Sequence, residues 1–262
     1  MIKPKKHFHN IERIKEKEPS RFFKYRLDRN ERNQPFGLKF IEILKDKING
    51  ELLMVYPELD QIYEKLAKWL NIKEDMLMLN AGSEQAIKSV FETYINPGDT
   101  ILIHFPSFAM YGVYAKLFQA NVINQYFDSE LKFDWDLFIN RINKDIRMMV
   151  IENPNGFLGV TPPFDKLKAL AKRAHECNVI VLIDEAYFLF SDDTAIDLID
   201  EYDNIIIVRT FSKAFGLAGI RVGYLISHAE NINALKKVRP TYEINNLAAI
   251  VVSEMLDRKE EM

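Results

Sequence analysis

The sequence contains almost no cysteine and has no long apolar run. Cys177 is the single cysteine among 262 residues, so no disulfide bond can form within the chain, and a reducing compartment is expected. No uninterrupted apolar stretch reaches the roughly 20 residues that a membrane-spanning helix needs. The opening residues MIKPKKHFHN are basic and lack the apolar centre of a secretory signal. These absences predict a soluble, cytoplasmic protein that does not bind a membrane.

An excess of positive charge is absent as well. Lys and Arg number 35 against 38 Asp and Glu, which gives a net charge of −3 and no basic footprint for nucleic acid. Gly216, Gly219 and Gly223 do not have the GxGxxG spacing that typically binds a nicotinamide dinucleotide. The hydrophobic share of 48% is ordinary for a globular protein, and the length suits one large domain with a substantial core.

Short apolar runs alternate with longer helical patterns through most of the chain. Seven strands are predicted, at residues 76–79, 100–104, 121–126, 146–151, 179–184, 204–210 and 222–226. The runs at 179–183 and 205–208 are apolar throughout, as in strands that helices cover on both faces. The repeated strand–helix order predicts an α/β fold: a mostly parallel seven-stranded sheet with helices on both faces.

Helices are predicted between these strands and at both ends of the chain. The expected helices are residues 83–94 with Ser83 as N-cap, a helix after Pro106-Ser107, residues 164–176, residues 38–48, residues 59–70, and the stretch 229–262. Residues 1–37 are highly charged and resemble an extended arm, with one short helix near residues 11–18.

Reactive side chains follow the predicted strands at the points where those strands end. In open α/β sheets, ligands bind beyond the carboxyl ends of the strands. Asp184 ends one strand and Tyr187 follows it, while the next strand runs into Thr210, Ser212 and Lys213. Other strand ends lead to Gly82, Ser83 and Glu84, to Phe108, and to Asn155. We therefore expect these groups to meet at one edge of the sheet.

This combination suits a phosphorylated pyridine aldehyde. The amine of Lys213 can form an imine with the aldehyde, particularly where its site lowers the pKa. A carboxylate such as Asp184 beside the ring nitrogen keeps that nitrogen protonated, so that the ring can accept electrons from a breaking bond. The N–H groups of a helix that starts near Gly82 suit the phosphate. Further groups that suit the phosphate or the ring face are Arg221, Thr210, Ser212 and Phe108.

Residues 210–224, TFSKAFGLAGIRVGY, closely resemble the Schiff-base lysine segment of fold-type I pyridoxal-phosphate (PLP) enzymes, and specifically the histidinol-phosphate aminotransferase group. The resemblance spans roughly residues 25 to 255, with the motifs in the family's order. It implies PLP as cofactor, bound to Lys213 as an aldimine. It also implies that Thr210, Ser212 and Arg221 contact the phosphate.

Further matches to the family imply roles for residues outside this segment. Asp184 and Tyr187 match the aspartate and tyrosine on the ring nitrogen and the ring hydroxyl. The remaining matches are Gly82-Ser83-Glu84 to the phosphate turn, Phe108 to the stacking aromatic, Tyr56 to a tyrosine that reaches the neighbouring subunit's phosphate, and Asn30 to a substrate-contacting asparagine. The resemblance therefore implies a homodimer with Tyr56 contributed across the interface.

Two departures from the family affect these expectations. The family's asparagine on the ring hydroxyl aligns with Gly156, and only a shifted loop would bring Asn155 to that position. Loss of that hydrogen bond predicts a raised aldimine pKa. The family also continues into a small domain with a carboxylate-binding arginine, whereas this sequence ends at Met262. The expected division is an arm and first helix (1–50), a PLP-binding large domain (51–240) and the start of a truncated C-terminal domain (241–262).

The favoured function is a PLP-dependent transamination of a small, phosphorylated amino compound, with a small-molecule amino donor and acceptor. Because residues 210–224 indicate only the cofactor, a decarboxylase of a serine- or threonine-phosphate type of amino acid stays open. A non-catalytic PLP-binding relative is a third possibility. His7 and His9 lie in a terminal stretch, so no metal site is expected. Arg209 by itself has the character of an ion-paired surface residue.

Overall fold

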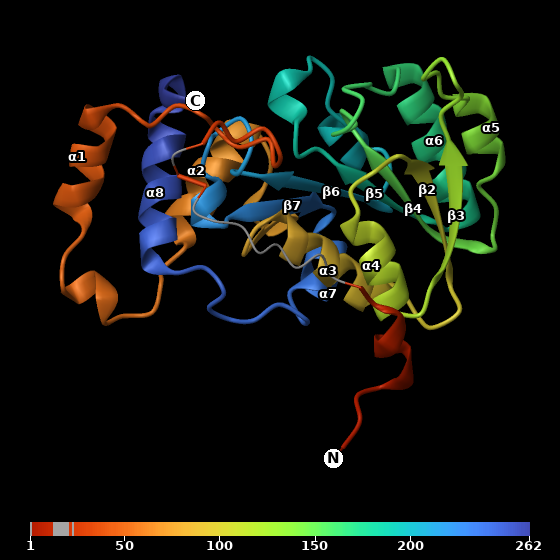
Figure 1. The fold of residues 1–262 in the computed structure, drawn as a ribbon, viewed down its shortest axis with the longest axis horizontal. Coiled ribbons are helices and arrows are strands. Elements are labelled where there is room, and N and C mark those ends of the chain that lie inside the picture. Colours follow the sequence, from red (N-terminus) through yellow and green to blue (C-terminus); the bar gives the residue numbers. More distant parts are fainter. Residues whose placement is uncertain (1, 13–20, 23) are drawn as a thin grey trace.

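A seven-stranded sheet forms the centre of the computed structural model, which describes residues 2–12, 21–22 and 24–262 (Figure 1). The strands are β1 Leu77–Asn80, β2 Thr100–Phe105, β3 Asn121–Tyr126, β4 Ile146–Glu152, β5 Ile180–Asp184, β6 Ile205–Thr210 and β7 Gly223–Ser227. Their order is β1-β7-β6-β5-β4-β2-β3. Only the two pairings of β7 are antiparallel. The predicted mostly parallel sheet is confirmed.

Helices cover both faces of this sheet, as predicted. They are α1 Leu38–Lys47, α2 Asp60–Leu70, α3 Ser83–Tyr94, α4 Met110–Leu117, α5 Trp135–Asn140, α6 Phe164–Cys177, α7 Ala229–Leu235 and α8 Asn246–Asp257. Figure 1 shows α1, α2 and α8 grouped near the β7 side of the sheet and α5 and α6 in the other half, where α6 contacts α5 and β5.

Alternation along the central strands explains the two layers. In β5, Val181 and Ile183 pack into one core cluster with α2, α6 and α8, whereas Leu182 packs into the other with α3, α4 and α7. All three side chains are fully buried. An uninterrupted apolar run is therefore required, since each face of the strand meets helices instead of water.

Three local predictions need correction. The stretch 229–262 is not one helix, because residues 236–245 separate α7 from α8. Pro240 lies in this break and has no N–H to donate to a helical hydrogen bond. A new helix begins after Asn245, whose side chain accepts a hydrogen bond from Ala248 N and so caps α8. The N-cap of α3 is Gly82, and Ser83 is the first helical residue. The short helix α5, capped by Asp134, was not predicted. The helix expected near residues 11–18 falls mainly outside the described residues.

Arg209 also differs from its prediction, because it is buried at 2% exposure. Its Nη2 lies 2.7 Å from Oε2 of Glu185, a fully buried carboxylate, and its Nε lies 2.9 Å from the same oxygen. The Glu185 carboxylate further accepts hydrogen bonds from Thr194 and from Ala195 N. The charge of Arg209 therefore belongs to a buried network that joins β6 to the segment after β5.

The helices of the described residues are too short or too polar for a bilayer span: none combines the length and the apolar character that crossing a membrane requires.

Candidate active site

A cavity of about 610 Å³ lies at the carboxyl ends of β4, β5 and β6. It is the position at which an open α/β sheet binds ligands. Ten of the predicted site residues line it: Asn30, Ser83, Glu84, Phe108, Asp184, Tyr187, Thr210, Ser212, Lys213 and Arg221. These ten residues therefore meet at one edge of the sheet, as expected.

Lys213 and Asp184 face this cavity from adjacent strands. Lys213 follows β6, and its Nζ donates a hydrogen bond of 2.8 Å to the backbone oxygen of Arg29. Burial lowers the pKa of Lys213, although the charge of Asp184 acts in the opposite direction. A lowered pKa increases the share of uncharged amine at neutral pH, which is the nucleophilic form.

Asp184 is a buried carboxyl with two orienting partners. The hydroxyl of Tyr111, on α4, donates to Oδ2, and the backbone N–H of Ala186 donates to Oδ1 at 2.9 Å. Burial raises the pKa of Asp184, while the Tyr111 hydrogen bond lowers it. A cation held against this carboxyl would favour its ionised form, because an opposite charge nearby lowers a carboxyl pKa.

The start of α3 and the side chain of Arg221 form a site suited to an anion. The N-cap residue of α3 is Gly82, which has no side chain to cap it, and the first-turn N–H groups of a helix have no acceptor within the helix itself. Arg221 has a left-handed backbone with φ 58°, and its Nη1 lies 3.3 Å from the Ser212 hydroxyl. The Thr210 hydroxyl accepts from Ser212 N at 3.1 Å and fixes this turn. A helix start, a guanidinium and a hydroxyl together match a phosphate dianion.

Gly82 permits this arrangement, and its replacement gives a testable prediction. Its φ is +84°, and a Cβ there would lie 2.7 Å from Nη2 of Arg221. Gly82→Ala is expected to cost about 1–3 kcal/mol in strain, part of it as weaker binding of a phosphorylated ligand. The measurement is a titration with PLP followed by absorbance. Gly98→Ala is the matched control, because Gly98 has φ +92° but open space around it. Equal affinities in the two variants would contradict the prediction.

Phe108, Tyr187 and Asn30 form another part of the cavity wall. Phe108 is 38% exposed and stands edge-on to Tyr111, with ring centroids 5.9 Å apart. Asn30, in the N-terminal arm, donates from Nδ2 to the Tyr187 hydroxyl at 2.8 Å. The Nζ of Lys213 lies 5.5 Å from the centre of the Tyr187 ring. The arm therefore closes over the two residues that follow β5 and β6.

Asn155 does not reach the cavity. Its Nδ2 donates to the backbone oxygen of Pro106 at 2.8 Å, and its Oδ1 accepts from the N–H groups of Phe157 and Leu158. These bonds hold the buried amide within the loop, so Asn155 does not line the cavity, whereas the neighbouring Gly156 does. The structure therefore does not support the shifted loop that a cofactor role for Asn155 would require.

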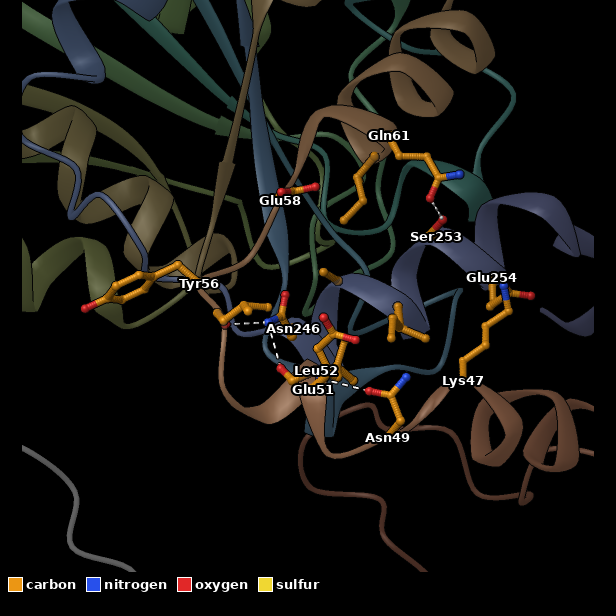
Figure 2. Close-up of a pocket in the computed structure, with 14 residues that line it drawn as sticks. Lys47, Asn49, Glu51, Leu52, Tyr56, Glu58, Gln61, Asn246, Ser253 and Glu254 are labelled. Atoms are coloured by element: carbon orange, nitrogen blue, oxygen red, sulfur yellow. Dashed lines mark hydrogen bonds and ion pairs between the residues drawn. The ribbon is translucent and has the colours of Figure 1, made fainter.

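Tyr56 lies apart from the cavity, on a second hollow lined by α2 and α8 (Figure 2). Its side chain is 73% exposed and stacks on Tyr242, with ring centroids 4.2 Å apart. Figure 2 shows the Tyr56 ring pointing away from Gln61, Ser253 and the other labelled residues of this hollow. Within one chain, Tyr56 has no contact with the phosphate-binding groups.

Two residues of the site were missed by the sequence reasoning. Glu152 ends β4 and lines the cavity at 4% exposure, and Tyr111 holds Asp184 from α4. The sequence did contain a signal for Glu152, namely an acidic residue at the end of an apolar strand. Asp184 ends the neighbouring strand in the same way, and the two residues are paired in the sheet. Nothing in the sequence distinguishes Tyr111 from the tyrosines that only pack in the core.

The sheet and its cavity define a class of protein: an α/β enzyme fold with a half-buried lysine, a buried carboxyl and a group of side chains suited to an anion around one hollow. Comparison with known families supports this class. The model of the family "Aminotransferase class I and II" matches residues 33–262. The chain belongs to this family, whose members are PLP-dependent transaminases.

Individual relatives agree with the family. The histidinol-phosphate aminotransferase of Thermoanaerobacter pseudethanolicus is 34% identical over 240 residues, covering 89% of this chain and 67% of that protein. The crystal structure of the histidinol-phosphate aminotransferase from Clostridium acetobutylicum superposes with a TM-score of 0.79 at 26% identity, covering 88% of this chain and 69% of the other. This chain thus spans about two thirds of the length of these relatives.

A decarboxylase shares the fold as well. The structure of L-threonine-O-3-phosphate decarboxylase from Porphyromonas gingivalis superposes with a TM-score of 0.74 at 19% identity, over 86% of this chain and 70% of that one. Identity this low indicates the common fold alone. The fold therefore does not decide between transamination and decarboxylation.

The residues present fit PLP, judged on the cavity itself. An anion site at α3, a buried carboxyl at Asp184 and an amine with a lowered pKa at Lys213 correspond to the phosphate, the ring nitrogen and the aldehyde. The Phe108 side chain offers an apolar surface to the ring.

Proposed function

We propose that this chain is a PLP-dependent aminotransferase that acts on a small, phosphorylated amino compound, with Lys213 as the residue that binds the cofactor covalently. The observation that carries the proposal is that Lys213 and Asp184 line one cavity together with Arg221 and the start of α3, groups that suit an anion. PLP, when bound, supplies an electron-accepting ring that stabilises negative charge at the substrate α-carbon.

The residues of the chain have separate tasks in this proposal. Lys213 would hold the cofactor through Nζ and, as a free amine, would accept at Nζ the proton that leaves the substrate α-carbon. Its lowered pKa keeps a share of Nζ uncharged for both tasks. Asp184, oriented by Tyr111 and Ala186 N–H, holds the proton on the ring nitrogen. Ser83, Ser212 and Arg221 bind the phosphate, and Phe108 excludes water from one face of the ring.

A phosphorylated substrate is supported by the relatives' printed name, histidinol-phosphate aminotransferase. Asn30 is proposed to contact this substrate, because the arm places it against Tyr187 at the mouth of the cavity. We further propose that residues 51–240 form the cofactor-binding domain, with 1–50 as arm and first helix and 241–262 as the start of a smaller domain. We also propose that the protein is located in the cytoplasm.

The substrate and the reaction are tested together by product analysis. Purified protein loaded with PLP is incubated with carboxyl-labelled phosphoserine or with histidinol phosphate, each with 2-oxoglutarate. Formation of glutamate and of the keto or aldehyde product supports transamination. Release of labelled carbon dioxide supports the alternative, a decarboxylase of a phosphorylated amino acid. Tight PLP binding with neither product supports a non-catalytic relative.

Tyr56 is proposed to complete the phosphate site of a second copy of the chain. Its support is an exposed apolar stretch: Leu53, Met54, Val55 and Tyr56 are 55–84% exposed, beside Tyr242 at 56%. An apolar surface of this kind commonly marks an interface.

A mixing experiment tests the dimer. Lys213→Ala and Tyr56→Ala are expected to be impaired separately, and mixing them under exchange conditions is expected to restore about a quarter of the sites, because each mixed twofold dimer has one site with both residues intact. Activity that stays at the sum of the two separate variants would contradict a Tyr56 contribution across the interface.

A further inference from the structure

Glu152 is a buried acid in the wall of the cavity for which the proposed function provides no role. It is the last residue of β4 and is 4% exposed. Its Oε1 accepts a hydrogen bond from the backbone N–H of Phe108, and its Oε2 accepts one of 2.8 Å from the backbone N–H of Gly156. Both partners belong to loops that line the same cavity.

The absence of a side chain at Gly156 lets the Tyr187 ring and the Glu152 carboxyl approach this position closely. A Cβ built on Gly156 would lie 3.6 Å from Oε2 of Glu152 and 2.9 Å from Cε2 of Tyr187. A side chain at position 156 would therefore press against the Tyr187 ring. With glycine there, the Glu152 carboxyl and the Tyr187 ring lie near one another in the lining of the cavity.

The surroundings of Glu152 favour its uncharged form. Burial, followed by the charge of Asp184, raises the pKa of Glu152 to about 7, although the two backbone hydrogen bonds act in the opposite direction. Among its titratable neighbours, His104, Tyr111 and Tyr187 carry no positive charge at neutral pH, whereas the cationic Lys213 and Arg221 line the same cavity. Burial lowers the pKa of His104, whose Nε2 accepts from Glu152 N, to about 4, and raises the pKa values of Tyr111 and Tyr187.

We propose that Glu152 binds the ring hydroxyl of the cofactor together with Tyr187, in place of the side chain that Gly156 lacks. This inference rests on the proposed function. A protonated Glu152 donates a hydrogen bond to the ring oxygen, whereas an ionised Glu152 places a second negative charge beside it. The protonation of this one carboxyl therefore tunes the proton affinity of the bound cofactor and, with it, the pH midpoint of the cofactor's visible absorption band.

The test compares wild type, Glu152→Gln and Glu243→Gln, each loaded with PLP and titrated across the absorption band. The amide of Glu152→Gln carries no charge, and its oxygen can keep only one of the two backbone hydrogen bonds. Its Nε2 can donate to the ring oxygen at every pH, so the midpoint in this variant is expected about one pH unit below that of wild type. Glu243 is the matched control. Its pKa is also raised by burial and it accepts from Asn80, but it does not line the cavity. Its replacement is expected to leave the midpoint unchanged.

The outcomes separate the proposals. A wild-type protein without a PLP-dependent band overturns the proposed function and this inference with it. A band whose midpoint is the same in wild type and in Glu152→Gln overturns this inference alone. Glu152 would then only join the two loops through its backbone hydrogen bonds, and its replacement would lower the thermal stability without moving the midpoint.

A measurement on wild type replaces the variant if Glu152→Gln does not fold. The infrared band of a protonated buried carboxyl is titrated in protein loaded with PLP and with an analogue that lacks the ring hydroxyl. The inference predicts that the carboxyl band of protein loaded with PLP is shifted relative to that of protein loaded with the analogue. Identical titrations of the two samples would overturn it.

Discussion

Lys213→Ala is expected to lose the covalent attachment of PLP and at least about a thousandfold in transamination rate, because general acid–base catalysis alone contributes roughly 10²–10⁴-fold. The variant removes the nucleophile of attachment and the base at the α-carbon together. The anion site at α3 and the Asp184 carboxyl are left in place, so non-covalent affinity for PLP should persist. The same pocket would then bind the cofactor without activating it.

The measurement is the single-turnover conversion of loaded enzyme by an amino donor, followed through the cofactor's absorption. Lys172→Ala is the matched control, since Lys172 is an exposed lysine on α6, away from the cavity. A Lys213→Ala protein that retained the wild-type rate would show that another residue moves the proton.

The second large effect is on stability. Arg209→Met is expected to destabilise the fold by about 3–5 kcal/mol, because it leaves the charge of Glu185 buried without its partner. Arg209 and Glu185 are 2% and 0% exposed at the side chain, and the guanidinium makes two bonds to one carboxylate oxygen. The lost contact of Arg209 with the Phe188 ring, 3.9 Å from its centre, adds to this cost.

Adding Glu185→Gln separates the charge from the packing. The double variant Arg209→Met with Glu185→Gln is expected to be more stable than Arg209→Met alone, because the buried charge is gone while Thr194 and Ala195 N keep an acceptor. The free energy of unfolding in urea measures each step. A double variant that is less stable than the single one would show that packing, and not the unpaired charge, dominates.

Much of the fold was predictable because its central strands are buried on both faces. The bounds of α3 agree with the predicted residues 83–94, and those of the mostly exposed edge strand β3 agree with 121–126. The stretch after residue 229 was less predictable, because its apolar periodicity continues across a break. The helix α5 has only six residues, too few for its periodicity to stand out against loop sequence.

The site divides in the same way. Strand-end positions such as Asp184 and Lys213 follow from the order of elements, because parallel strands bring their carboxyl ends to one edge. The direction of a loop amide does not follow: Asn155 turns away from the cavity to satisfy two backbone N–H groups. The burial of Arg209 depends on Glu185, 24 residues earlier, and neither residue signals the pair by itself.

The central claim is that Lys213 binds the cofactor, and borohydride reduction of PLP-loaded wild-type protein tests it most directly. Reduction fixes the cofactor to its lysine, and peptide mass mapping then locates it. The account predicts a single modified peptide containing Lys213, with no modification in Lys213→Ala. Modification at another lysine, or none in a protein that remains folded, would contradict it.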